Sequence, residues 1–207
     1  MFLFRFYLIS AAAGAPAPAG VLSTLVDGGL RALQVREKAL SPAALAQFST
    51  ELLSHLRPGQ ERPWVFLNDR ADLALSLGLD GVHLRNDSLP LERHAVALRR
   101  SLLYGVSTHS LAGVRAAEAA GADFVTFGPI FDTPSKAPYG EPVGLRALER
   151  VARVARLPIF ALGGITPERV PACLNAGAWG VSAIAAIWKA PRPAEALAAF
   201  RDALGTL

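Results

Sequence analysis

The stretch WVFLNDRADLALSLGLDGVHL (residues 64–84) contains one complete unit of the pattern on which the fold depends. It opens with an apolar run at residues 64–68 and closes with a second one at residues 81–84. Between them, residues 70–77 carry leucine and alanine at helical spacing, and Gly78 follows where a helix should stop. The stretch therefore predicts a strand, a covering helix and a second strand parallel to the first.

The same alternation extends along the whole chain. Strands are predicted at residues 3–9, 32–36, 64–68, 81–84, 103–107, 124–128, 158–162 and 180–184. Helices are predicted at residues 41–56, 70–77, 91–99, 111–119, 145–154, 167–174 and 192–204. The apolar strand runs are typical of a parallel sheet that is covered on both faces.

Eight such units can form either a closed barrel or an open doubly wound sheet. Eight units in 207 residues favour closure, although the chain is at the lower end of the size range for such barrels. The Gly-x-Gly-x-x-Gly dinucleotide signature follows none of the predicted strands, and no linker divides the chain. The prediction is an α/β protein that folds as a single (β/α)₈ TIM barrel over residues 1–207.

Composition excludes several classes of protein and partner. Hydrophobic residues make up 52% of the chain and charged residues only 18%, so a large core can form and a disordered chain is excluded. The net charge of +4 comes from scattered arginines without a basic stripe, so we expect no nucleic acid partner. No uninterrupted apolar run reaches the ~18 residues of a membrane-spanning helix, so we expect no membrane association.

The cytoplasm is the expected location. Cys173 is the single cysteine and cannot form an internal disulfide. The N-terminal segment mimics a signal peptide, but Arg5 interrupts its apolar region and cleavage near Ala19 would remove the first predicted strand. The sequence contains no indication of oligomeric state.

Candidate site residues follow the predicted strands, because the loops at the carboxyl ends of barrel strands form the site in this fold. After the second strand, Gln34, Arg36 and Lys38 alternate along the chain and are predicted to point the same way. An amide and two cations suit a pyrophosphate. A solvated strand end with salt bridges is the alternative.

The third and fifth strands also end in polar residues. Asp69 places a carboxylate where Mg²⁺ on a phosphate could bind, or it caps the following helix. Ser107 begins a hydroxyl-rich segment that could bind phosphate, and Ser110 is expected to cap a helix. His109 beside that cap and His83 within a strand are expected to be structural.

Two later loops predict anion binding. Residues 128–140 carry Thr133, Ser135 and Lys136, which together could clamp a phosphate, the alternative being an ordinary surface loop. After the seventh strand, Gly163 and Gly164 let backbone amides approach a ligand at a helix N-terminus, the usual phosphate position in these barrels.

Seven short segments in chain order resemble the thiamine phosphate synthase/TenI family. They are LQVREK (33–38), LNDR (67–70), GVHL (81–84), GVSTHS (105–110), GPIFDTPSK (128–136), LGGITP (162–167) and residues 177–187. Synthases of this family join a hydroxymethylpyrimidine diphosphate to a thiazole phosphate, release pyrophosphate and use Mg²⁺. The resemblance implies a transferase of thiamine biosynthesis that acts on these small phosphorylated substrates.

The resemblance also implies roles for individual residues. The residues implied to bind substrate are Gln34, Val35, Arg36, Glu37, Lys38, Asn68, Ser107, Thr133, Pro134, Ser135, Lys136, Gly164, Ile184 and Ala185. Those implied in catalysis are Arg36, Lys38, Ser107 and Lys136, which lie around the diphosphate. Gln34 and Asn68 are implied to bind the pyrimidine, and Asp69 is implied to bind Mg²⁺. The residues implied to bind the thiazole phosphate are Thr133, Ser135, Gly164 and the amides of Ile184 and Ala185.

Two positions depart from the family pattern. Ser88 stands where the synthases have an aspartate as second Mg²⁺ ligand, and Arg85 stands in place of a glycine. Either Asp87 takes over as ligand by a one-residue shift or Arg85 replaces the charge of the metal. Pro129 stands where TenI-type tautomerases have their catalytic histidine.

Three functions are compatible with these departures. Synthase chemistry is favoured because the diphosphate and pyrimidine residues are all present. A TenI-like thiazole tautomerase and a non-catalytic regulatory paralogue that binds a thiamine intermediate are the alternatives.

Overall fold

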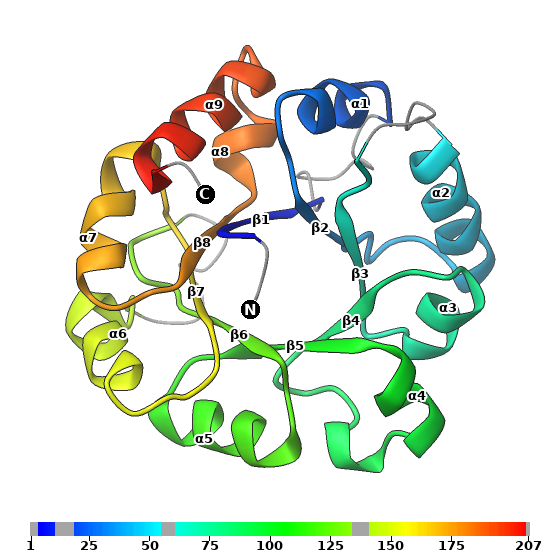
Figure 1. Ribbon diagram of the computed structural model, residues 1–207, viewed down its shortest axis with the longest axis horizontal. Coiled ribbons are helices and arrows are strands. Elements are labelled where there is room, and N and C mark those ends of the chain that lie inside the picture. Colours follow the sequence, from blue (N-terminus) through cyan, green and yellow to red (C-terminus); the bar gives the residue numbers. More distant parts are fainter. Residues whose placement is uncertain (1–3, 11–18, 55–60, 134–140, 206–207) are drawn as a thin grey trace.

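The strands close into a barrel in chain order, each parallel to its neighbours. A computed structural model describes residues 4–10, 19–54, 61–133 and 141–205 of the chain. The strands are β1 (Phe6–Ile9), β2 (Ala32–Val35), β3 (Trp64–Asn68), β4 (Gly81–Leu84), β5 (Leu103–Thr108), β6 (Phe124–Phe127), β7 (Ile159–Leu162) and β8 (Gly180–Ala183). β1 pairs with both β2 and β8, which closes the ring. The predicted (β/α)₈ barrel is confirmed (Figure 1).

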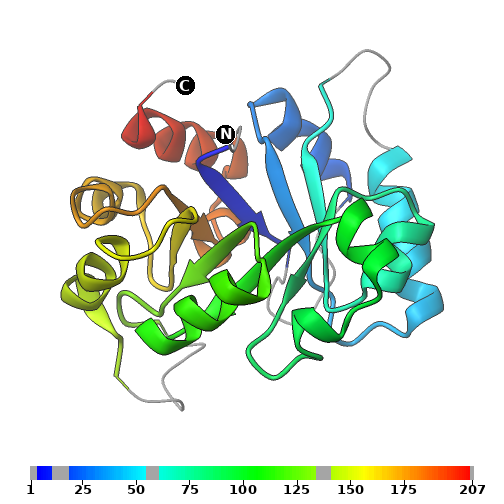
Figure 2. The ribbon, with the colours of Figure 1, turned by 60° about the horizontal axis from the view of Figure 1, so that its bottom comes forward.

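Helices surround the barrel on its outside, as Figures 1 and 2 show. The α-helices are α1 (Ala19–Asp27), α2 (Pro42–Ser54), α3 (Ala71–Ser76), α4 (Val96–Ser101), α5 (Leu111–Ala120), α6 (Gly144–Ala152), α7 (Val170–Asn175), α8 (Ala185–Trp188) and α9 (Pro193–Leu204). The 3₁₀ turns η1 (Leu91–Arg93) and η3 (Pro167–Arg169) precede α4 and α7, respectively. Every predicted helix is present, but those at residues 91–99 and 167–174 are each divided. Pro171 has no N–H to donate, so a new helix begins at Val170 instead of continuing from η3.

Capping residues mark several helix boundaries. Ser110 accepts a hydrogen bond from the Gly113 amide (3.1 Å), as predicted. Gly121 ends α5 in the left-handed conformation (φ 88°), which glycine adopts without steric cost. Thr166 lies at the N-cap of η3, but its side chain makes no capping hydrogen bond to a backbone amide. Its hydroxyl hydrogen-bonds the side chain of Glu168 instead.

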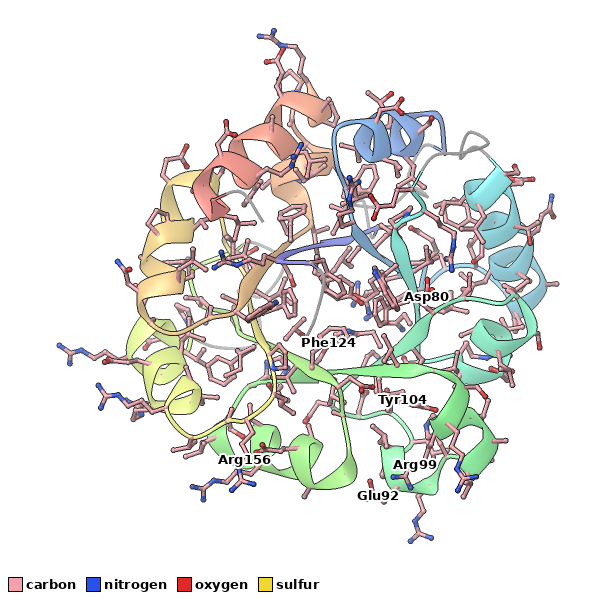
Figure 3. The ribbon with its side chains drawn as sticks, viewed as in Figure 1. Asp80, Glu92, Arg99, Tyr104, Phe124 and Arg156 are labelled. Carbon is pink, nitrogen blue, oxygen red and sulfur yellow. The ribbon has the colours of Figure 1, made fainter. Side chains whose placement is uncertain are left out.

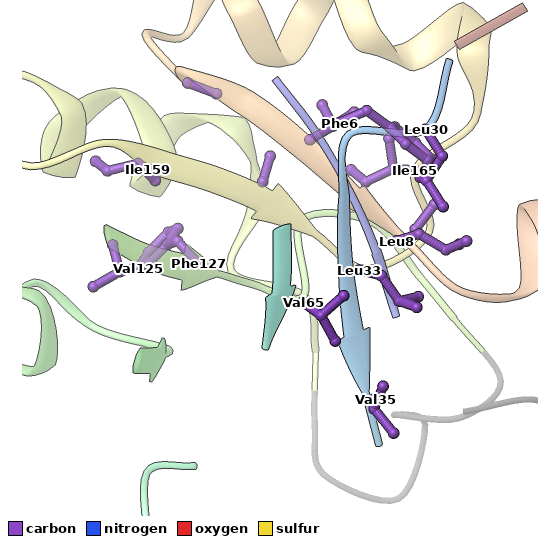
Figure 4. Close-up of a cluster of buried hydrophobic side chains, with 14 of the residues drawn as sticks. Phe6, Leu8, Leu30, Leu33, Val35, Val65, Val125, Phe127, Ile159 and Ile165 are labelled. Atoms are coloured by element: carbon purple, nitrogen blue, oxygen red, sulfur yellow. The ribbon is translucent and has the colours of Figure 1, made fainter. Parts of the chain in front are cut away.

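The barrel strands separate two apolar regions. Side chains that point outward pack beneath the helices, including Leu33, Val65 and Phe127 (Figure 4). Side chains that point inward form an aromatic cluster of Phe4, Tyr7, Phe66, Phe124 and Phe160. Figure 3 shows Phe124 inside the ring of strands. This cluster fills the middle of the barrel, so a ligand site must lie at one end of the barrel, outside the cluster.

Gly180 marks a point where two backbones approach closely. A Cβ at this position of β8 would lie 2.1 Å from the carbonyl oxygen of Arg5. We therefore expect Gly180→Ala to lower the free energy of unfolding by about 1–3 kcal/mol, because the backbone beside β1 must shift. Denaturant unfolding measures the change. Gly20→Ala is the control, because among the described residues no atom beyond its own helix backbone and chain neighbours lies within 4 Å of its Cβ position in α1. Equal stability of the two variants would contradict the tight β1–β8 contact.

The helices bear on the reactivity of the single cysteine and on the predicted location of the protein. Cys173 in α7 is fully buried, and burial raises the pKa of its thiol to about 11, so it stays an inert core residue. The cytoplasmic location stays a prediction. In the part of the chain that the structure describes, every helix is too short or too polar to cross a membrane.

Candidate functional site

A layer of polar side chains lies inside the barrel near the carboxyl ends of the strands. Gln34, His83, Thr126 and Ser182 are almost completely buried there. Each comes from a different strand and lies two residues beyond an inward-facing alanine, phenylalanine or glycine, as strand alternation requires. This layer, which we call the polar floor, forms the base of a site that opens at the strand ends.

His83 is hydrogen-bonded on both ring nitrogens. Its Nδ1 lies 3.3 Å from the Tyr7 hydroxyl, and its Nε2 lies 3.0 Å from the Ser107 hydroxyl and 3.4 Å from that of Thr126. Burial lowers the pKa of His83 to about 3, so the ring is neutral at ordinary pH. The expectation that His83 is structural agrees with this arrangement. The ring fixes Ser107 at the mouth of the barrel.

The neutral state of His83 makes stability depend on pH. In the unfolded chain a histidine takes up a proton near pH 6.5, whereas folded His83 does so only near pH 3. The stabilising contribution is therefore complete above pH 6.5 and is lost progressively as the pH falls towards 3. We expect wild type to lose about 1 kcal/mol more stability per pH unit between pH 6 and 4 than His83→Gln. Denaturant unfolding at several pH values measures both slopes, and identical slopes would contradict a buried neutral ring.

The end of β2 brings together Arg36, Glu37 and Ser10. The Ser10 hydroxyl donates to Glu37 Oε1 (2.5 Å) and accepts from the Arg36 amide (2.9 Å). Ser10 is fully buried, so this bridge fixes the backbone from which the half-buried Arg36 side chain emerges. The remaining two predicted residues of this segment lie in different surroundings, and their roles in binding stay predictions. Val35 is buried in the outer core, and Lys38 lies exposed in a turn, because β2 ends before strand alternation can orient it.

A chain of side-chain hydrogen bonds crosses from β2 to β4. The Gln34 amide donates to Asn68 Oδ1 (3.3 Å), and the Asn68 amide donates to Asp69 Oδ2 (2.9 Å). Asp69 then accepts from Arg85 Nε at its Oδ2 (2.6 Å) and from the Ser88 hydroxyl at its Oδ1. The predicted convergence of Gln34, Asn68 and Asp69 at neighbouring strand ends is therefore present.

Asp69 has an unusual backbone conformation. Its φ of 61° is the only positive value for a residue other than glycine in the part of the chain that the structure describes. Such conformations cost energy and occur disproportionately at functional sites. Burial alone would raise the pKa of Asp69, but hydrogen bonds from Ser88 and Arg85 outweigh it and leave the pKa below its ordinary value. Asp69 is thus an ionised carboxylate at the rim of the barrel and does not cap α3 by a side-chain hydrogen bond.

The residues at this rim fit a metal site with one protein carboxylate and do not fit one with two. Both oxygens of Asp69 accept hydrogen bonds from the protein, and Ser88 occupies the place beside it. Asp87 is 73% exposed and faces Arg85 Nε at 3.5 Å, so it does not replace the second ligand by a one-residue shift. Across residues 4–10, 19–54, 61–133 and 141–205, no three His, Cys, Asp or Glu side chains gather closely enough to hold a metal ion.

Two guanidinium groups at the rim, those of Arg36 and Arg85, lie close enough to influence each other's charge. Arg36 has a lowered pKa, first because it is partly buried and next because Arg85 is close, although Asp69 and Glu37 act in the opposite direction. Like charges repel, so their proximity favours an anion between or above them. A hollow of about 490 Å³ lies beside Arg85, and its lining includes Asp69, Ser88 and Arg93 but not Arg36.

The second predicted anion site lies on the opposite side of the barrel mouth. Backbone hydrogen bonds join Ile130 to Leu162 (2.9 Å) and Phe131 to Gly163 (3.0 Å), so the loop after β6 lies against the loop after β7. Thr133 is half-buried at the end of the described part of that loop. The predicted residues Pro134, Ser135 and Lys136 lie outside the described residues.

The loops after β7 and β8 supply backbone groups to this side. Gly164 has a φ of 63°, and a Cβ there would lie 2.5 Å from the Asp132 carbonyl oxygen, so only glycine fits between the two loops. Ile184 precedes α8 and Ala185 begins it. The first amides of a helix have no partner inside the helix, which suits an anion.

Residues beyond the predicted set also contribute to the site. Ser10, Thr126 and Ser182 are fully buried polar residues, and Ser182 Oγ has no hydrogen-bond partner within the described part of the chain. A polar residue within or just after an otherwise apolar strand was the available sequence signal for each of them. His109 contacts the Gly128 carbonyl oxygen through Nδ1 (2.5 Å), in agreement with a structural role.

These features define the class of protein: a (β/α)₈ barrel with a polar, cation-bearing site at the carboxyl ends of its strands. The thiamine monophosphate synthase family model matches residues 6–187. The chain therefore belongs to the thiamine monophosphate synthase family.

Individual relatives agree with this membership. The thiamine-phosphate synthase of Anaeromyxobacter dehalogenans is 42% identical over 190 residues, covering 92% of this chain and 84% of that protein. That of Chlorobium luteolum is 35% identical over 189 residues, covering 91% and 88%. The solved thiamine phosphate pyrophosphorylase of Pyrococcus furiosus superposes with a TM-score of 0.79 at 26% identity, covering 97% and 95%. A 3-hexulose-6-phosphate synthase, at 20% identity and a TM-score of 0.74, shares the fold alone.

Proposed function

We propose that this protein joins hydroxymethylpyrimidine diphosphate to thiazole phosphate and releases pyrophosphate, as a transferase of thiamine biosynthesis. The observation that carries the proposal is the hydrogen-bonded chain from Gln34 through Asn68 and Asp69 to Arg85. It places amides suited to a pyrimidine ring directly beside a charged rim suited to a diphosphate. Family membership agrees with it, since the relatives compared above are named for this reaction.

In the proposed reaction the diphosphate leaves before the new bond is complete. The C–O bond between the pyrimidine methylene and the diphosphate breaks, and its electron pair goes to the departing pyrophosphate. The methylene carbon becomes a cation, and the thiazole nitrogen donates its lone pair to form the C–N bond of thiamine phosphate. The protein supplies no nucleophile. Its contribution is to hold both substrates and to stabilise charge on the leaving group.

The residues of the rim serve the leaving group. Arg36 offers a planar fork of donors to phosphate oxygens, on a backbone held by Ser10 and Glu37. Ser107 is oriented by His83 and donates its hydroxyl to the same group. Lys38 and Lys136 add point charges in this proposal, on the strength of the family resemblance alone.

Asp69 is the protein ligand that would hold Mg²⁺ carried in by the diphosphate. When bound, Mg²⁺ supplies positive charge to the leaving pyrophosphate, and one protein carboxylate is sufficient for a metal shared with phosphates. Asp69 also orients Arg85 and receives the Asn68 amide, so it connects the pyrimidine side to the diphosphate side.

The thiazole phosphate is proposed to bind on the opposite side of the mouth. Thr133 and Ser135 would donate hydroxyls, with Pro134 fixing the loop between them. Gly164 and the amides of Ile184 and Ala185 would complete the phosphate site. The polar floor would then lie beneath both rings.

The TenI-like alternative is disfavoured by one residue. Pro129 follows Gly128 in the loop after β6, and a proline side chain has no proton to transfer.

A comparison of substrates tests the proposal. The protein should form thiamine phosphate from both substrates with Mg²⁺, and none from either substrate alone, as followed by chromatography. Nuclear magnetic resonance of thiazole phosphate alone should show no tautomer conversion. Tautomer conversion without thiamine phosphate would support the isomerase instead, and binding without either reaction would support the regulatory paralogue.

A further inference from the structure

Arg85 is held at the rim in a way that leaves half of its guanidinium group available. Its Nε donates to Asp69 Oδ2 (2.6 Å) and faces Asp87 Oδ1 (3.5 Å). Within the described residues, Nη1 and Nη2 donate to no protein group. These two nitrogens form the pair of parallel donors that binds phosphate oxygens in a bidentate manner.

The local backbone fixes this orientation. The Arg85 amide donates to both Ser88 Oγ (2.8 Å) and Asp69 Oδ1 (3.2 Å). In the reverse direction, the Ser88 amide donates to the Arg85 carbonyl oxygen (3.2 Å). The turn after β4 is thus hydrogen-bonded to the Asp69 carboxylate at both of its ends, Arg85 and Ser88. The left-handed backbone of Asp69 directs its carboxylate toward this turn. The side chain of Arg85 is 40% exposed and borders the hollow of about 490 Å³.

We infer that Arg85 binds the diphosphate group directly through Nη1 and Nη2 and supplies positive charge on the side of the site where a second carboxylate would otherwise help to hold the metal. This inference rests on the proposed function for the identity of the ligand. The proximity of Arg36 supports it, because two guanidinium groups on one rim are stabilised when a multiply charged anion bridges them. Ser88 belongs to the same arrangement, since an aspartate there would compete with Asp69 for Arg85.

The probe is inorganic pyrophosphate, and the measurement is its dissociation constant by calorimetry in EDTA and in Mg²⁺. In EDTA, Arg85→Gln should weaken pyrophosphate binding about tenfold or more, because a charge-assisted bidentate contact is lost. Arg85→Lys should recover part of the affinity, since it restores charge without the fork.

Arg62→Gln is the matched control. Arg62 is 43% exposed and donates both Nη atoms to Asp80 at 2.7 Å, so it is a similarly exposed, ion-paired arginine. It precedes β3, at the end of the barrel opposite the site. Its substitution should leave pyrophosphate affinity unchanged.

A double variant tests whether the positive charge of Arg85 takes the place of Mg²⁺ in binding pyrophosphate. Arg85→Gly with Ser88→Asp should bind pyrophosphate poorly in EDTA and regain affinity when Mg²⁺ is added. Wild-type affinity of either Arg85→Gln or the double variant in EDTA would overturn the inference. These outcomes are separable from the proposed function: thiamine phosphate formation with unaltered pyrophosphate binding by Arg85→Gln refutes only the inference. Loss of pyrophosphate binding by Arg85→Gln in a protein that forms no thiamine phosphate refutes only the function.

Discussion

Asp69→Asn should lower kcat/KM for thiamine phosphate formation by about 10²–10³-fold, the usual cost of removing one group that stabilises developing charge. Asparagine has the shape of aspartate and tolerates the left-handed backbone (φ 61°) found at this position. The substitution therefore removes charge while the fold is kept. Arg85 loses the carboxylate that orients its Nε, and Mg²⁺ loses its proposed protein ligand.

Asp72→Asn provides the control for this prediction. Asp72 forms an ion pair with Arg70 at 2.6 Å and lies three residues further along the chain. It is 62% exposed, and both of its carboxylate oxygens accept from Arg70, whereas within the described residues neither Arg85 nor Ser88 contacts it. Steady-state kinetics of both variants should show a large loss for Asp69→Asn alone. A loss of similar size in both would show that any nearby charge matters and would contradict a specific role for Asp69.

Arg36→Gln should have an effect of the same order, about 10²-fold or more in kcat/KM. Arg36 emerges from a backbone fixed by Ser10, so its guanidinium is held where the leaving diphosphate is proposed to lie. Because the interaction strengthens as the diphosphate gains charge, kcat should fall together with kcat/KM. A rise in KM with unchanged kcat would indicate uniform binding and contradict a role in the departure of pyrophosphate.

The same strand offers a matched control for Arg36. Arg31 immediately precedes β2, whereas Arg36 immediately follows it, so the two lie at opposite ends of the barrel. Arg31 pairs with Glu61 at 3.3 Å and is 42% exposed. Arg31→Gln should leave the kinetic constants within about twofold of wild type, because surface ion pairs contribute little.

The strands were predictable from the sequence because a parallel sheet is covered on both faces. Each strand is a continuous apolar run. Seven observed strands agree with their predicted ranges to within one residue at either end, and β1 begins at Phe6, three residues later than predicted. Helix α1 was not predicted, since Gly20 and the β-branched Val21, Thr24 and Val26 lower its intrinsic propensity. Burial of Leu22 and Leu25 in the core holds it in the helical conformation. Helix α8 has four residues, which is too short for periodicity to appear.

The site was predictable where it depends on topology alone. The carboxyl ends of neighbouring parallel strands meet, so Gln34, Asn68 and Asp69 had to converge. The position of Lys38 was not predictable, because β2 ends at Val35 and the following turn replaces strand alternation.

The sequence also left open whether Asp87 or Arg85 compensates for Ser88. That choice depends on the left-handed backbone of Asp69 and on the closed turn from Arg85 to Ser88. Neither feature has a signature in the order of residues. In the structure Arg85 and Ser88 contact Asp69, whereas Asp87 faces solvent and Arg85.

The most direct test of the proposed reaction is the stoichiometry of its two products in one vessel. Wild-type protein, both substrates and Mg²⁺ should yield thiamine phosphate and pyrophosphate in a one-to-one ratio, with neither product formed when one substrate is omitted. Chromatography quantifies the first product and an enzyme-coupled assay the second. Pyrophosphate released without thiamine phosphate, or no product from either substrate pairing, would contradict condensation as the function of this barrel.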